Sequence, residues 1–318
     1  METMRVRTDT ERQVELFWDS SPCDSKRSGI SPGNVDYFLE IERDRYEHQL
    51  HIPRLLDNIQ WAGKRVLEIG TGVGTDARQL IARGATYTGV NIDRGSTELT
   101  KLALTRFGLS GIVQQADATA LPFPSNSFDV VYSYGVLHHI PNAQQAVSEI
   151  YRVLKPGGEI LVMVYNRSSI NYYIEIMLLR RIFVRLLSLP GVISALVAMG
   201  LPRETLDRHR QLYKARGPMN KAEWVSRNTD GPDNPYSRVY SHSEIERELF
   251  MFEVIRNEAY FFDHRHWGPI GQSLPAKMRY ALGRMWGWHR VVYGRKPTIG
   301  ANIATLAGRE TDTDGDKR

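Results

Sequence analysis

The chain has 318 residues, of which 42% are hydrophobic and 24% are charged, so it can bury a sizeable core and is not a disordered protein. Its net charge of +5 arises from 41 basic and 36 acidic residues that are mixed along the sequence, which argues against a nucleic-acid-binding surface. A single cysteine, Cys23, excludes an intramolecular disulfide and indicates a cytoplasmic protein. The charged N-terminus carries no sign of a secretory signal.

Residues 1–60 carry an intermittent apolar stripe among charged residues, which predicts helices. We expect them to form an N-terminal helical cap over the segment that follows. Residues 61–167 then alternate between apolar strands and amphipathic helices, which is typical of a doubly wound, mostly parallel sheet that binds ligands at the carboxyl ends of its strands. The expected strands are 65–69, 86–92, 111–115, 129–133 and 159–165, and the expected helices are 76–83, 96–107 and 142–154.

The alternation breaks after Tyr165. Residues 168–236 contain two apolar helical stretches and a polar loop, which is too long for a simple connection and predicts an inserted lid or substrate subdomain. Residues 237–308 resume the α/β pattern and are expected to complete the core. Their predicted elements are a helix at 244–250 behind the capping box Ser241-x-x-Glu244, and strands at 252–262 and 289–293. A polar tail, 309–318, follows.

A glycine-rich run, Val66-Leu67-Glu68-Ile69-Gly70-Thr71-Gly72-Val73-Gly74-Thr75, joins the first expected strand to its helix. Its glycines allow the backbone to approach a ligand, and the helix that follows offers free N–H groups to it. The turn therefore predicts a nucleoside-bearing cofactor. Its G-x-G-x-G spacing differs from the G-x-G-x-x-G of dinucleotide sites, which argues against a nicotinamide oxidoreductase.

Three later segments accompany this turn in order: the 116–123 run ADATALPF, the 127–133 strand SFDVVYS with VLHHIP at 136–141, and RVLKPGG at 152–158. Together they resemble the class I S-adenosylmethionine (SAM) dependent methyltransferases, and among these the group that includes ubiquinone and menaquinone methyltransferases. The resemblance covers residues 64–165. It implies SAM as cofactor and a Rossmann-like, mostly parallel seven-stranded sheet with an antiparallel final strand.

The resemblance also implies roles for single residues. Glu68 would bind the methionine ammonium group, and Asp117 with the Ala118 backbone would hold the adenine. Asn91 stands where the family usually has a carboxylate for the ribose hydroxyls, and Asp93 is the alternative. The implied cofactor-binding residues are Glu68, Gly70, Thr71, Gly72, Gly74, Asn91, Ile92, Asp117, Ala118 and Ser133.

Methyl transfer from SAM releases a neutral thioether, so the protein mainly has to position the acceptor and exclude water. A base is needed only for a protonated nucleophile. His138 and His139 are candidate bases because imidazole titrates near neutrality, although positioning of the cofactor loop is the favoured role for them. Tyr134 is a third catalytic candidate.

Candidate substrate contacts are Tyr165, Tyr240 and His242. The lid is rich in apolar side chains, which favours a small, lipophilic or aromatic acceptor. The residues of the polar loop at 230–235 are of the types that form turns, which is the favoured explanation for them. Asn234 is a further candidate for substrate contact. No metal is expected, because adjacent residues of the run His264-Arg265-His266 would point to opposite sides of a strand, and no spaced Cys, Asp or Glu partner completes a site.

The longest uncharged stretch, 186–202, is interrupted by Pro190-Gly191 and is too short for a transmembrane helix. The arginine-containing stretch 172–187 is amphipathic and has two readings: a helix that covers the core, which we favour, or a peripheral contact with a membrane or a greasy substrate. The oligomeric state stays open.

Two other functions compete with methyl transfer to a small molecule. A SAM-binding enzyme of a different reaction type would keep every motif above. A nucleic-acid or protein methyltransferase would carry Asn/Asp-Pro-Pro-aromatic after the fourth strand, where this chain has Ser133-Tyr134-Gly135-Val136. We therefore expect a small-molecule partner and no nucleic acid.

Overall fold

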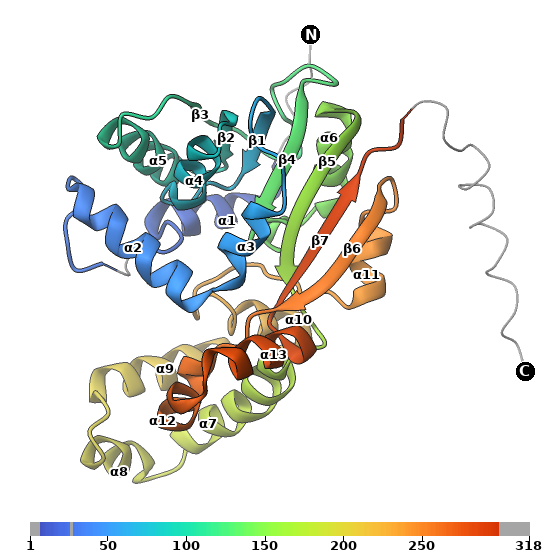
Figure 1. Cartoon of the computed structure of the whole chain (residues 1–318). Coiled ribbons are helices and arrows are strands. Elements are labelled where there is room, and N and C mark those ends of the chain that lie inside the picture. The colour runs from blue at the N-terminus through green and yellow to red at the C-terminus, as the bar shows by residue number, and fades with distance from the viewer. Residues whose placement is uncertain (1–6, 26–27, 299–318) are drawn as a thin grey trace, which may run out of the picture.

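Seven strands form one twisted sheet at the centre of the computed structural model, which describes residues 7–25 and 28–298 (Figure 1). The strand order is β3-β2-β1-β4-β5-β7-β6, and only β7 runs antiparallel to its neighbours. This arrangement confirms the expected Rossmann-like fold with an antiparallel final strand. The strands are β1 (Arg65–Ile69), β2 (Thr86–Asn91), β3 (Ile112–Gln115), β4 (Phe128–Tyr134), β5 (Leu154–Tyr165), β6 (Glu253–Tyr260) and β7 (His289–Arg295).

Helices cover both faces of the sheet, because alternate residues of each strand bury opposite apolar surfaces. On one face Leu67 and Ile69 pack with α6 (Ala143–Val153) and α11 (His242–Glu248). On the other face Val66 packs with α3 (His51–Asp57) and α4 (Thr75–Ala82). The helix α5 (Arg94–Arg106) lies beside β2 and β3, and α13 (Ala276–Trp286) lies against β6.

Side-chain caps explain where the core helices begin. The Asp93 carboxylate accepts a hydrogen bond from Ser96 N at 2.6 Å, so α5 begins at Arg94 rather than at the expected residue 96. The capping box of Ser241 and Glu244 is present and starts α11 at His242, two residues before the expected position. β5 begins at Leu154 instead of 159, but its pairing with β4 jumps from Leu154 to Glu159, so the expected turn at 155–158 survives as a bulge.

The N-terminal helices α1 (Asp9–Ser20) and α2 (Val35–His48) pack on the α5 side of the core. The segment after β5 folds into five helical pieces where the sequence indicated two apolar stretches and a loop. They are η2 (Asn171–Leu179, a π-helix), α7 (Arg180–Leu187), α8 (Val192–Ala198), α9 (Arg203–Arg216) and α10 (Lys221–Ser226). The short helices η1 (Leu137–His139), η3 (His264–Trp267) and α12 (Gly268–Ser273) complete the described chain.

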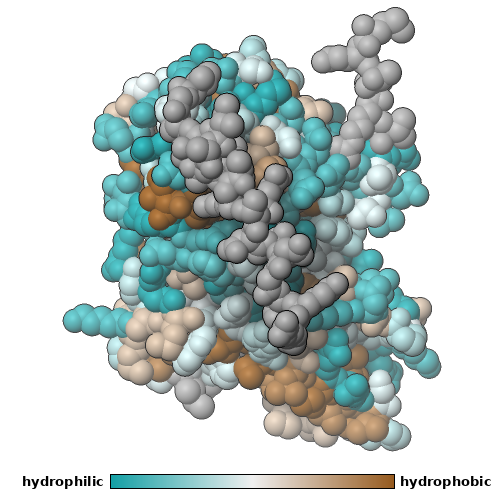
Figure 2. Space-filling view, turned by 90° about the vertical axis from the view of Figure 1, so that its right-hand side faces the viewer, coloured by the Kyte–Doolittle hydropathy of each residue, from teal (hydrophilic) through white to brown (hydrophobic). Residues whose placement is uncertain are grey.

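The helices α7, α8 and α9 gather at one end of the molecule, at the bottom of Figure 1. In the view of Figure 2, hydrophobic side chains collect on the surface at this same lower end. The expected polar tail at 309–318 lies outside the described residues.

Candidate active site

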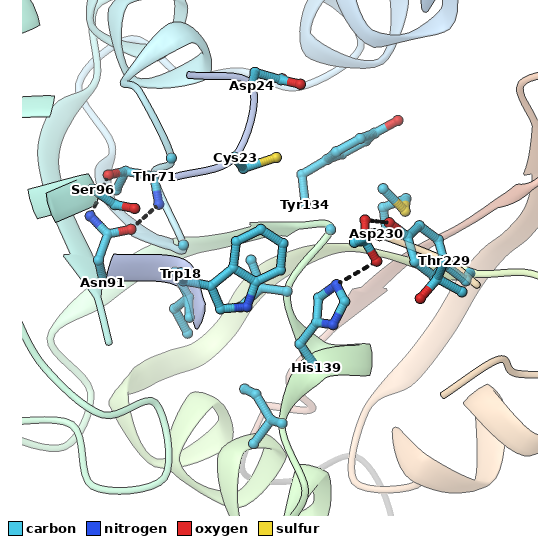
Figure 3. A pocket seen from close by; sticks show the side chains of 18 of the residues that line it. Trp18, Cys23, Asp24, Thr71, Asn91, Ser96, Tyr134, His139, Thr229 and Asp230 are labelled. Atoms are coloured by element: carbon cyan, nitrogen blue, oxygen red, sulfur yellow. Dashed lines mark hydrogen bonds and ion pairs between the residues drawn. The ribbon is translucent and has the colours of Figure 1, made fainter. Parts of the chain in front are cut away.

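A cavity of about 350 Å³ lies at the carboxyl ends of β1, β2 and β4. The glycine-rich turn bounds one side. The N-terminal segment, the inserted segment, and Trp288 and His289 at the start of β7 supply further parts of the wall. Figure 3 shows Thr71 and Asn91 on one side of this space, His139 and Asp230 on the other, and Trp18 between the two groups. Helix α1 contributes Glu11, Val14 and Trp18 to the cavity wall.

The three glycines of the turn all have positive φ, but they serve different contacts. A Cβ on Gly70 (φ +79°) would lie 2.1 Å from Val136 Cγ2, so this position requires glycine for packing as well as for backbone shape. Gly72 (φ +56°) lines the cavity, and a Cβ added there would have Cys23 as its nearest neighbour, at 3.7 Å. Gly74 lies outside the cavity wall and lets α4 pack closely on Thr100 and Ala103 of α5.

Glu68 is a buried carboxyl at the cavity wall. Tyr87 donates a hydrogen bond to it at 2.5 Å, while burial and the nearby Asp76 raise its pKa to about 8. No cationic side chain among the described residues forms an ion pair with it. A buried carboxyl whose ionisation is disfavoured in this way fits a ligand that brings its own positive charge.

Asp76, in the first turn of α4, ties the N-terminal helices to the core, a role that the sequence interpretation missed. It pairs with Arg45 at 2.8 Å and accepts hydrogen bonds from Tyr46 and Tyr132, each at 2.8 Å. Arg45 and Tyr46 belong to α2, whereas Tyr132 belongs to β4. The sequence shows that an acidic residue follows the glycines closely. It does not show the partners of Asp76, because they lie 30 or more positions away along the chain.

Asn91 ends β2 at the cavity wall and holds the glycine turn. Its amide oxygen accepts from Thr71 N at 2.7 Å, and its amide nitrogen donates to Thr71 Oγ1 at 2.7 Å. Asp93 also lines the cavity, and its buried carboxylate caps α5. Burial raises the pKa of Asp93.

The segment after β3 supplies another part of the wall through Asp117 and Ala118, and Ile92 lies beside them. One carboxylate oxygen of Asp117 accepts from Thr119 N at 2.8 Å, and the other pairs with Arg7 at 3.2 Å. The buried Ser133 is not part of the wall.

At the far side of the cavity, His139 and Asp230 face one another. His139 Nε2 lies 3.4 Å from Asp230 Oδ2, and His139 Nδ1 lies 2.9 Å from the Tyr236 carbonyl oxygen. Tyr165 donates to Asp230 Oδ1 at 2.6 Å and stacks on Trp288, with ring centroids 4.4 Å apart. Both nitrogens of His139 therefore face oxygen acceptors, so neither presents a lone pair to the cavity, whereas the carboxylate of Asp230 has acceptor positions to spare.

Three candidates from the sequence lie outside the cavity wall. His138 is fully buried, packs on the Tyr165 ring and finds no hydrogen-bond partner among the described residues, and burial lowers its pKa. Tyr240 lies in the apolar core beside β5, and His242 is exposed at the start of α11 with Glu246 at 3.1 Å. Direct contact between these side chains and a bound molecule is therefore not supported.

The polar loop contributes a different residue from the one expected. Asn234 is buried and bonds within its own loop, to Thr229 and Tyr236 N, whereas Thr229 and Asp230 line the cavity.

Tyr134 lies at the wall together with His289, and it joins a buried cluster that the sequence did not indicate. Its hydroxyl lies 2.6 Å from His51 Nε2 and 3.1 Å from His289 Nδ1. Burial lowers the pKa of both histidines, that of His51 to about 3, and raises the pKa of Tyr134. All three groups are thus neutral near pH 7, and they join α3, β4 and β7 beneath the cavity.

Comparison with known proteins gives matches centred on the core. Residues 67–162 match a family described as a methyltransferase domain. A sterol 24-C-methyltransferase of Gibberella zeae is 41% identical over 99 residues, which is 30% of this chain and 26% of that protein. A ubiquinone biosynthesis O-methyltransferase of Pseudomonas putida is 31% identical over 122 residues, 38% of this chain and 52% of that protein. The matched region thus spans about a quarter to a half of these relatives.

Among solved structures, a chain from the complex between the Haloferax volcanii Trm112 methyltransferase activator and a methyltransferase aligns over 92% of this chain and 100% of its own length. Its TM-score is 0.53 at 15% sequence identity, a similarity that concerns the fold.

Proposed function

We propose that this protein transfers a methyl group from SAM to a small lipophilic acceptor. The proposal starts from the class I SAM-dependent methyltransferase domain that the chain carries. The observation that carries the proposal is a single cavity with two unlike ends. One end is the glycine turn with the buried Glu68, and the other is an aromatic wall around Asp230. We further propose a cytoplasmic enzyme with no nucleic-acid partner.

The cofactor end fits SAM because the charges match. SAM carries an ammonium and a sulfonium group, and Glu68 is a buried carboxyl without a cationic partner among the described residues. We assign the ammonium to Glu68, the amino-acid tail to the backbone of Gly70, Thr71 and Gly72, and the adenine to Asp117 and Ala118 beside Ile92. Asn91 is assigned to the ribose, with its amide already oriented by Thr71. When bound, SAM supplies an activated methyl group whose transfer leaves a neutral thioether.

Gly74 and Ser133 support this end without touching the ligand, since neither lines the cavity. Gly74 allows α4 to pack on α5, and Ser133 lies in the strand that leads to Tyr134.

The acceptor end combines aromatic surfaces with one carboxylate. Tyr165 and Trp288 stack at the wall, and Trp18 meets the His139 ring edge-on at 5.0 Å. These surfaces suit a lipophilic or aromatic molecule. Where the nucleophile of the acceptor is a hydroxyl, the carboxylate of Asp230 would take its proton, while bound SAM would supply the methyl group and leave as the neutral thioether. His139 and Tyr165 hold Asp230 in place, so His139 is a positioning residue in this proposal.

Calorimetry with SAM and with S-adenosylhomocysteine tests the cofactor assignment, with NAD as the negative control. We expect both sulfur compounds to bind and NAD to give no heat. Incubation with methyl-labelled SAM and a panel of lipophilic phenols, quinones and acids then tests the activity. Labelled product with stoichiometric S-adenosylhomocysteine supports methyl transfer. Conversion of an acceptor without label in the product would instead favour a different SAM-dependent reaction.

A further inference from the structure

The inserted segment exposes a group of large apolar side chains that do not line the cavity. We define the lid surface by its exposed apolar residues: Tyr173, Ile174, Leu178, Leu179, Ile182, Leu186, Leu189, Met199 and Leu201. Leu178, Ile182 and Leu186 are 49%, 43% and 43% exposed and follow one another at intervals of four residues, so they share one side of the η2–α7 helix. Figure 2 shows the hydrophobic area at this end of the molecule.

The two helical segments of the lid surface meet at a sharp angle. In the part of the chain that the structure describes, no single helix has the length and apolar character to cross a membrane. The segments Asn171–Leu187 and Val192–Ala198 reach the required composition only together, and they are bent by 105° at the break between them. Two short helices at such an angle present apolar side chains along a surface, which is the geometry of an interfacial segment.

The charges around the lid surface favour an anionic partner. Residues 171–216 contain eight arginines and lysines and three carboxylates. Glu175 is paired with Arg180 at 2.8 Å, and Asp207 lies 2.9 Å from Arg210. Arg185 is exposed on the same helix as the apolar residues and forms no ion pair with a described carboxylate. Arginines that flank an apolar face are the residues that attract a helix to anionic lipid.

The same helix also borders the cavity. Asn171, Glu175, Ile176 and Arg180 line the cavity wall, while Leu178 and Ile182 face away from the protein. The repeat of four to five residues among the lining positions matches the wider turn of the π-helix over Asn171–Leu179. One helix therefore separates the acceptor end of the cavity from the lid surface.

We infer that the lid surface docks this protein onto an anionic lipid bilayer and so brings the acceptor end of the cavity next to the membrane. The placement of the acceptor end next to the membrane rests on the proposed function. It deepens that function because a lipophilic acceptor would be concentrated in the bilayer. Docking itself requires only the exposed apolar side chains and the arginines beside them.

Vesicle co-sedimentation tests the inference with the full chain. We expect binding to vesicles of phosphatidylglycerol and phosphatidylcholine, and weaker binding to phosphatidylcholine alone or at high salt. The double variant Leu178→Gln/Ile182→Gln should bind about tenfold more weakly, because two exposed apolar side chains no longer enter the lipid. The matched control is Ile112→Gln/Ile255→Gln, which changes two exposed residues of β3 and β6 and should bind like the unchanged protein.

Three results would overturn the inference: no binding to anionic vesicles, an equal loss in both double variants, or a stable dimer that Leu178→Gln/Ile182→Gln dissociates. The last result would identify the lid surface as a contact between two copies. Circular dichroism on the same samples shows that the variants are folded, and SAM calorimetry tests the proposed function separately. Vesicle binding without SAM binding would refute the proposed function alone, and SAM binding without vesicle binding would refute the docking alone.

Discussion

Replacing Gly70 by alanine tests how the glycine turn is built. At φ +79° an alanine is strained by about 1–2 kcal/mol, since its Cβ approaches the following carbonyl. The new Cβ would also lie 2.1 Å from Val136 Cγ2, and both Cγ1 and Cβ of Val136 would be at 3.1 Å. Val136 must therefore move, at a further cost of about 1–3 kcal/mol. We expect Gly70→Ala to lower the free energy of unfolding by about 2–5 kcal/mol.

Gly72→Ala is the matched control, because its φ of +56° brings similar backbone strain but its Cβ would have no neighbour closer than 3.7 Å. This variant should lose only about 1–2 kcal/mol. Urea denaturation of both variants, and of each combined with Val136→Ala, separates the two contributions. The double variant Gly70→Ala/Val136→Ala should recover the steric part when compared with Val136→Ala alone. Equal stability of Gly70→Ala and Gly72→Ala would refute the close contact between the turn and Val136.

The remaining predictions concern the two ends of the cavity. Asp230→Asn should lower kcat about 100-fold for a hydroxyl acceptor and leave the Kd for SAM unchanged, and an unchanged kcat in a steady-state assay would rule out Asp230 as the proton acceptor. His138→Phe should keep activity within about threefold and should not lower the Tm, because it replaces a buried imidazole that has no hydrogen-bond partner among the described residues; a large loss of kcat would return His138 to the mechanism. Glu68 titrates at about 8 when folded and near 4.5 when unfolded, so the folded state holds more protons between these values and stability falls as pH rises through this window, by up to about 1.4 kcal/mol per pH unit. Glu68→Gln should flatten that part of a urea-denaturation pH profile, and parallel profiles for the two proteins would show that Glu68 is ionised in the folded state.

Local sequence patterns determined most of the core of this protein. Short apolar runs between turns and helices identified all seven strands, and the cap at Ser241 placed a helix to within two residues, because these features depend on neighbours within one turn or one strand. The glycine spacing and the segments after it indicated the cofactor for the same reason: the residues that form the turn are contiguous. The position of the lid was visible as a break in the pattern, whereas its five helical pieces were not.

Only the tertiary structure decided which side chains meet at the acceptor end. His138 and His139 are neighbours of the same residue type, and the short η1 turn directs one into the core and the other toward Asp230, which is 91 positions later. His51, Tyr134 and His289 come together from separate elements that are at least 83 positions apart along the chain. Such contacts arise because parallel strands end at one edge of the sheet and the helical segments fold over that edge. A local sequence pattern does not indicate which distant side chain will fill the space there.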